Sequence, residues 1–229
     1  MNAVKYEGDI KDTVDAYNAL NKNSQSGNYW DKTDAGIPEV KKHIKDHYKK
    51  VQEHTCVYCQ QKIVVEHAMA WDIEHIIPKT PYPQFLFTEE NLAVSCKDCN
   101  LIKFDKNVLK NPKRKRFPKK SEDYIISHPH YDEYDEHIHI IADKLYRPKD
   151  AKGEKTIEVC GLLRFAYKYT DYGETNEDIE ITKQIVKLGK ELISASNATE
   201  TAFIIDCLKD LKDFREKKSR DIYLKSLLK

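Results

Sequence analysis

Two Cys-x-x-Cys pairs, far apart along the chain, constrain this sequence more than any other feature. The pairs are Cys56–Cys59 and Cys96–Cys99, and the 36 residues between them run from 60 to 95. Four thiolates hold one tetrahedral zinc ion and leave no open position for a substrate. We therefore predict a structural zinc site. Four unrelated buried thiols and a redox pair are the alternatives; neither pair lies at the strand-to-helix turn typical of redox motifs.

The bulk composition favours a reducing compartment and excludes a membrane segment. The other two cysteines, Cys160 and Cys207, are isolated, which differs from the dense pattern of a secreted disulfide scaffold. The first residues lack an apolar signal region, and no run of about 18 apolar residues occurs. We expect a cytoplasmic protein without membrane association. The net charge of +1 does not by itself indicate a partner.

Residues Glu74 and His75 lie between the cysteine pairs, in a strand that we predict over residues 72–77 and that Pro78 ends. A histidine that titrates near neutral pH can take a proton from water, and a divalent ion neutralises charge that develops on a phosphate. Neighbouring strand residues point to opposite faces, so both side chains reach one metal-bound water only where the strand twists or ends. A purely structural histidine is the alternative for His75.

Three short motifs occur in a fixed order around these residues. They are Ile73–Lys79, Asn91-Leu92 and Cys96–Lys103. Over about 50 residues their order and spacing resemble the HNH endonucleases, the ββα-metal nuclease class, and the cysteine pairs resemble its zinc-stabilised subset. The resemblance implies a nuclease core of two strands and a helix that hydrolyses phosphodiester bonds.

The resemblance also implies a role for each matching residue. His75 would be the general base, Glu74 would bind the catalytic divalent ion, Asn91 would brace the loop and orient His75, and Asn100 would be a second ligand of the catalytic ion. Many members have Asp in place of Glu74 and His in place of Asn100. Both replacements in this chain keep oxygen donors, which favours Mg²⁺ or Mn²⁺.

A basic stretch follows the last motif. From Lys103 to Lys120 there are nine Lys or Arg residues and a single acid, Asp105. Such a segment displaces counterions from a nucleic-acid backbone, although a nuclear localisation signal is the formal alternative. Lys79 and Lys103 are equally well read as phosphate contacts or as ordinary surface lysines. The candidate substrate contacts are Lys79, Lys103, Lys113, Arg114 and Arg116.

A narrower resemblance extends over about residues 50–165. The segments 107–118, 128–132, 136–138 and 153–157 are similar to the HNH proteins of the Septu anti-phage type, the PtuB subunit, which also occurs as a retron effector. This implies a bacterial defence nuclease held by an ATPase partner of the ABC or SMC-like PtuA type. His128, His130 and Asp132 are either a second metal or substrate cluster or a packing turn. We favour the turn, because Pro129 breaks regular geometry and no fixed ligand spacing is recognisable.

The expected fold class is α+β, with a ββα-metal HNH core stabilised by the four-cysteine site and embedded in N- and C-terminal helices. We expect an N-terminal helical segment over residues 1–54, the nuclease core with its zinc knuckles over 55–125, and a mainly helical region over 126–229. Two helices are predicted over about 8–24 and 38–53, and a third begins at Asn100. Most of the chain after residue 155 is also predicted to be helical. Further strands are predicted over 63–65 and 137–141.

These features predict a metal-dependent endonuclease that cuts nucleic acid within a defence complex. DNA is the default substrate, and transfer RNA or other RNA is the alternative. Two other hypotheses stay open. One is a non-catalytic zinc-ribbon module that binds nucleic acid or protein, which would need neither Glu74 nor His75. The other is a scaffold subunit with a dormant nuclease.

Overall fold

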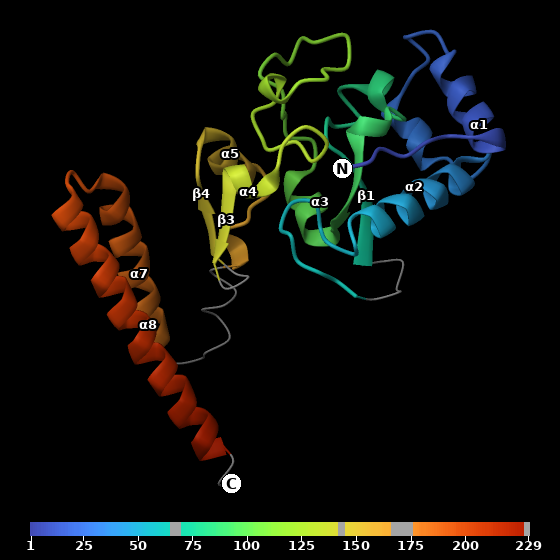
Figure 1. Cartoon of the computed structure of the whole chain (residues 1–229). Helices are drawn as coiled ribbons and strands as arrows, with labels where there is room; N and C mark the ends of the chain where they lie inside the picture. The colour runs from blue at the N-terminus through green and yellow to red at the C-terminus, as the bar shows by residue number, and fades with distance from the viewer. Residues whose placement is uncertain (65–69, 142–144, 166–175, 227–229) are drawn as a thin grey trace. The chain divides into compact units, whose positions relative to one another are not determined.

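The computed structural model describes residues 1–64, 70–141, 145–165 and 176–226 (Figure 1). The chain forms two compact units, Met1–Phe165 and Ala166–Lys229, which are described separately. The first unit begins with α1 (Gly8–Asn18) and α2 (Ile37–Val51), both predicted from their apolar spacing. Pro38 in the first turn of α2 suits that position, because proline has no backbone N–H to leave unpaired there.

The centre of the first unit is an antiparallel pair of strands followed directly by a helix. β1 (Trp71–His75) pairs with β2 (Leu92–Cys96) in a register that runs from Trp71 opposite Cys96 to His75 opposite Leu92. The chain then enters α3 (Lys97–Lys103) without a loop. The second cysteine pair therefore lies at a strand-to-helix turn, contrary to the expectation for both pairs. This arrangement confirms the α+β class, with a hairpin and a helix around four cysteines and helices flanking them.

The strand predicted over residues 63–65 is absent at its described positions. Ile63 and Val64 belong to no strand, and Val65 lies outside the described residues. Val64 is 75 % exposed, and this stretch forms one isolated bridge, between Thr55 and Lys62. The partner of β1 is instead β2, all five of whose residues are buried. A β-branched run indicates a strand only where a partner edge and a covering layer exist.

Tyrosines from the N-terminal segment and helices hold the loop between β1 and β2. The hydroxyls of Tyr6, Tyr17 and Tyr48 donate to the carbonyl oxygens of Phe87, Pro83 and Glu89, at 3.0, 2.8 and 2.6 Å. Tyr17 and Tyr48 are fully buried. The loop that connects the two strands is therefore fixed to α1 and α2, and its backbone can position side chains at the end of β1.

A second hairpin completes the first unit. It contains α4 (Tyr134–His137), β3 (Ile138–Ile141), β4 (Leu145–Pro148) and α5 (Ala151–Val159), and β3 was predicted whereas β4 was not. Gly153 is required in α5, because a Cβ there would lie 1.9 Å from the carbonyl oxygen of His137. In the second unit, α7 (Asn176–Ser194) packs against α8 (Ala198–Ser226).

Candidate active site and metal centre

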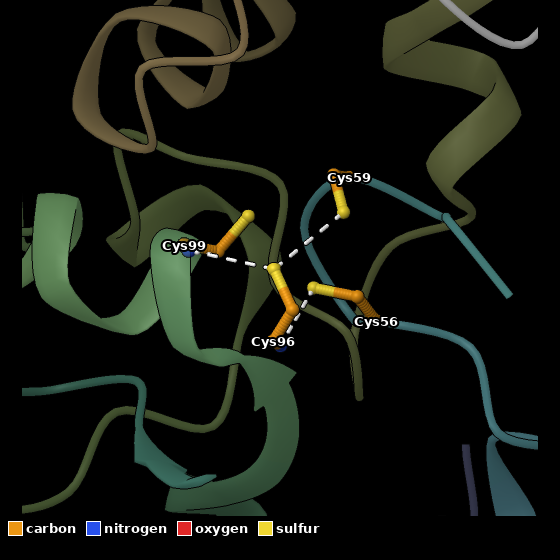
Figure 2. Close-up of side chains that lie close together, drawn as sticks. All are labelled: Cys56, Cys59, Cys96 and Cys99. Carbon is orange, nitrogen blue, oxygen red and sulfur yellow. Dashed lines mark hydrogen bonds between the residues drawn. The ribbon is translucent and has the colours of Figure 1, made fainter. Parts of the chain in front are cut away.

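The four cysteines of the two pairs lie together in the first unit (Figure 2). All four are buried, and their sulfur atoms lie within 4.8 Å of one another. The backbone N–H of Cys96 donates to Cys56 Sγ at 3.2 Å, and that of Cys99 donates to Cys96 Sγ at 3.5 Å. Such N–H···S bonds stabilise thiolates, so the backbone of the second knuckle, Cys96–Cys99, is arranged for deprotonated sulfur in both pairs.

The distances between the sulfur atoms suit zinc. A tetrahedral ion with bonds of about 2.3 Å separates its ligand sulfurs by about 3.8 Å. Cys59 Sγ and Cys96 Sγ, one from each pair, are 3.9 Å apart. The predicted ligand set Cys56, Cys59, Cys96 and Cys99 therefore fits one zinc ion. An ion there would join β2 and α3 to the segment that follows α2.

One face of β1 carries two carboxylates that α3 covers. Asp72 and Glu74 are two residues apart and so share a strand face. Asn100 Nδ2 donates to Asp72 Oδ2 at 3.0 Å, and Lys103 Nζ lies 2.6 Å from Glu74 Oε1. Asn100 and Lys103 are three residues apart on one side of α3. Predicted site residues from two of the three motifs are thus brought together.

Glu74 is more enclosed than a metal ligand open to substrate would be. Its side chain is 2 % exposed, and the hydroxyl of Tyr58, from the first knuckle, donates to the same Oε1 at 3.0 Å. Burial raises the pKa of Glu74, and Lys103 and Tyr58 offset this rise by favouring the charged form. Glu74 therefore fixes α3 and the knuckle to β1 in this structure, whereas Asp72, with a 30 % exposed side chain, is more accessible.

His75 lies on the opposite face of β1. Its Nε2 lies 3.0 Å from the carbonyl oxygen of Leu86, and its ring packs edge-on against Trp30 at 4.6 Å. Burial lowers the pKa of His75 to about 3, so the ring is neutral at pH 7. Because a carbonyl oxygen only accepts, Nε2 carries the proton and Nδ1 carries the lone pair. A pKa of about 3 makes this ring a weaker base than the histidine titrating near neutral pH that the sequence led us to expect.

Asn91 makes three hydrogen bonds to backbone atoms of the loop between the strands. Its Oδ1 accepts from the N–H of Ile77 at 2.7 Å, and its Nδ2 donates to the carbonyl oxygens of Ile77 and Phe85, both at 3.1 Å. Phe85 precedes Leu86, whose carbonyl oxygen holds His75. The amide therefore acts on His75 through the backbone, three atoms of which it fixes.

The basic residues proposed as substrate contacts fall into different environments. Lys103 is fully buried, and its ammonium also donates to the carbonyl oxygen of His75 at 2.9 Å, so the structure does not place it where a phosphate can reach it. Lys79 contacts Asp31 at 3.1 Å, and Arg114 pairs with Asp123. Lys113 and Arg116 are exposed.

The loop that carries these exposed basic side chains is anchored near the site. Phe117 packs edge-on against Phe85 with ring centroids 5.4 Å apart, and Tyr82 donates its hydroxyl to the carbonyl oxygen of Pro112 at 2.7 Å. Phe85 and Tyr82 belong to the loop that also contains Leu86, which contacts His75. The basic stretch is thus fixed to the same loop as the histidine.

The histidines after residue 125 form a packing turn. His128 is fully buried with its ring stacked on Tyr131 at 4.4 Å, and Asp132 Oδ2 accepts from the backbone N–H of His128 at 2.7 Å. Lys152 pairs with the same carboxylate at 2.6 Å. Among the described residues, the cysteine cluster is the one group of three or more His, Cys, Asp or Glu side chains with metal-ligand geometry.

Three residues of this region were not predicted from the sequence. Asp72 could have been found from its period-two spacing with Glu74. Tyr58 lies inside the first Cys-x-x-Cys motif, but its contact with Glu74 depends on the fold. Trp30, which covers His75, comes from a 3-10 turn in a polar stretch and carries no sequence signal.

Two known proteins are similar to parts of this chain. The chain is 28 % identical to the Septu protein PtuB of Bacillus thuringiensis over 162 residues, which cover 69 % of this chain and 56 % of that protein. It is 29 % identical to the retron Vc95 putative HNH endonuclease of Vibrio cholerae over 134 residues, 54 % of this chain and 58 % of the relative. These matches span little more than half the length of each relative. No solved structure matches.

The described helices include none with the length and apolar character that a membrane span requires.

The family model of the HNH endonucleases matches residues 56–106, which contain both cysteine pairs, β1, β2 and α3. Its match coincides with the segment in which the structure assembles the cysteine cluster, Glu74, His75 and Asn100. Over these residues the chain is therefore similar to the HNH endonuclease family.

Proposed function

We propose that this chain is a metal-dependent endonuclease that hydrolyses phosphodiester bonds of nucleic acid, DNA by default and RNA as the alternative substrate. The observation that carries the proposal is the contact of His75 Nε2 with the carbonyl oxygen of Leu86 at the end of β1, which leaves the lone pair on Nδ1, within the segment that the family model matches. The oxygen donors Asp72 and Glu74 lie on the other face of this short strand. His75 takes a proton from the attacking water through Nδ1. Asn91 keeps the ring in place by fixing the loop that holds it.

The oxygen donors on the α3 side of β1 suit a hard divalent ion. Glu74 and Asn100 are the proposed ligands of Mg²⁺ or Mn²⁺, and we add Asp72, whose contact with Asn100 Nδ2 leaves the amide oxygen of Asn100 for a cation. A bound ion neutralises charge on the scissile phosphate and the leaving oxygen. Lys103 balances the charge of Glu74, and Lys113 and Arg116 contact the nucleic-acid backbone.

We further propose that the nuclease is the effector of an anti-phage system of the Septu type, with an ATPase partner of the ABC or SMC-like kind. The similarity to the Septu protein PtuB and to a retron endonuclease supports this setting. An ATPase that must be present for cleavage would agree with it, and full activity of the isolated chain would argue against a restraining partner.

The test compares wild type with His75→Gln on plasmid DNA and on total tRNA, each with Mg²⁺, Mn²⁺ or EDTA, with and without the ATPase partner. His139→Gln is the matched control, because His139 is an exposed histidine on β3 away from this site. Cleavage that needs metal, survives in His139→Gln and drops at least 100-fold in His75→Gln supports the proposal. Unchanged cleavage in His75→Gln contradicts it. Retained zinc and an unchanged melting temperature show that each variant is folded.

A non-catalytic nucleic-acid-binding or scaffold role is the second candidate. The burial of Glu74 against Lys103 favours it, because a closed ion pair is a structural device that hydrolysis does not need. Binding of DNA or RNA without cleavage under every metal and partner condition would support this candidate over the nuclease.

A further inference from the structure

Arg164 contacts the cysteine cluster from outside the family-matched segment. Its Nη2 donates to Cys99 Sγ at 3.0 Å. Its Nη1 donates to the carbonyl oxygens of Cys160 and Gly161, at 2.9 and 3.0 Å. The guanidinium is therefore held by its own turn after α5 and directed at one sulfur atom, in the fixed fork geometry that arginine provides.

The turn that carries Arg164 packs against the helix that carries Cys99. Gly161 has φ +61, and a Cβ there would lie 2.7 Å from Ile102 on α3. Lys106, just beyond α3, donates to the carbonyl oxygen of Val159 at 2.9 Å. Because this close approach requires glycine, the position of Arg164 relative to Cys99 is set by backbone packing, and the contact is more than the chance reach of a flexible side chain.

The same part of the chain contacts the first knuckle, but through neutral groups. The hydroxyls of Tyr134 and Tyr146 donate to the carbonyl oxygens of Tyr58 and Cys59, at 2.8 and 2.5 Å. The segments 134–141 and 145–165 thus contact both knuckles. Of the hydrogen bonds named here, the one that brings a charge is made to a sulfur of the second pair. This difference allows the effect of charge to be separated from that of packing.

We propose that Arg164 is a positioning residue of the metal centre, which donates a hydrogen bond to the Cys99 thiolate and supplies a counter-charge to it. Four thiolates around a divalent ion leave a net charge of about −2 in a buried place, which is costly without compensation. A charge-assisted N–H···S bond lowers that cost and orients the ligand. The inference depends on the cysteine cluster and not on nuclease activity.

Zinc affinity tests the inference directly. Arg164→Met keeps the length of the side chain and removes the charge and the donors. We expect zinc to pass to a competing chromophoric chelator at an affinity 10- to 100-fold weaker than in wild type. Arg147→Met removes the same charge from an exposed position on β4, and Tyr146→Phe removes one neutral hydrogen bond to the first knuckle. Both controls should stay within a few-fold of wild type.

A spectroscopic readout separates the proposal from a purely structural role. With Co²⁺ in place of zinc, the sulfur-to-cobalt charge-transfer band should shift in Arg164→Met, because the electron density on Cys99 changes. A lower melting temperature with unchanged affinity and an unchanged band would mean that Arg164 only caps its turn, and would overturn the proposal. If Arg164→Met does not fold, Arg164→Lys and Arg164→Gln decide: tighter zinc binding by Lys supports the proposal, and equal binding overturns it.

Discussion

The cysteine cluster and the end of β1 come from the same 56–106 segment, yet they are built in different ways. The cluster gathers four side chains of one type around a single point, and its backbone N–H groups point at sulfur. At the end of β1, Glu74 and His75 are adjacent in sequence but face opposite sides, one toward Lys103 and the other toward Leu86 and Trp30. Spacing alone thus predicts the cysteine cluster. The environment of Glu74 and His75 depends instead on which neighbouring residues the fold places against them.

Removal of the metal centre should have the largest effect. Cys96→Ser should abolish tight zinc binding and unfold residues 55–165, because structural zinc contributes roughly 10–16 kcal/mol of apparent binding free energy to folding in small domains. Zinc content and circular dichroism report both losses. Cys207→Ser, on α8, should leave both at wild-type levels. A folded Cys96→Ser protein without metal would show that packing, and not zinc, joins the knuckles.

How far the sequence predicts the fold differs between these two regions for a physical reason. The cysteine cluster and the helices predicted over about 8–24 and 38–53, observed at 8–18 and 37–51, follow from spacing and periodicity. A role for Asn91 in the loop is what the family resemblance implied. β2 was missed because its Leu92–Cys96 run is buried throughout and shows no alternation. The burial of Lys103 could not be predicted, because a lysine has no sequence mark that distinguishes an internal ion pair from a surface position.

The titration of His75 should give the next largest effect. Its pKa is about 3 in the folded chain and near 6.5 when unfolded, so the unfolded state binds more protons between these values. Stability should fall as pH drops below about 6.5, by up to about 1.4 kcal/mol per pH unit and on the order of 5 kcal/mol in all. Urea unfolding at several pH values should show a shallower slope in His75→Gln. The exposed control His139→Gln should keep the wild-type slope, and equal slopes in all three would contradict the burial of His75.

Loss of the ion pair between Lys103 and Glu74 should have the third largest effect. Lys103→Met leaves a buried carboxylate without its counter-charge and should cost about 3–5 kcal/mol in the free energy of unfolding, measured with urea. Adding Glu74→Gln should recover part of this loss, because the charge itself is then gone. Lys97→Met, which removes an exposed lysine 3.9 Å from Asp72, should cost less than about 1 kcal/mol. If the double variant is no more stable than Lys103→Met, the two residues are not coupled as the structure shows.

The smallest effect is expected for exposed residues of the basic stretch, 103–120, which we propose to contact the substrate. Lys113→Gln and Arg116→Gln should each weaken binding to DNA a few-fold and lower the slope of log K against log salt by about 1, because each exposed side chain replaces about one counterion. Lys11→Gln and Lys42→Gln, on the exposed surfaces of α1 and α2, are the charge-matched controls. Equal slopes in all four variants would mean that the backbone is bound elsewhere. A change confined to Lys113 and Arg116 would place nucleic acid on the basic stretch, which Phe117 fixes to the loop that contacts His75. It would also argue that substrate reaches the site despite the burial of Glu74.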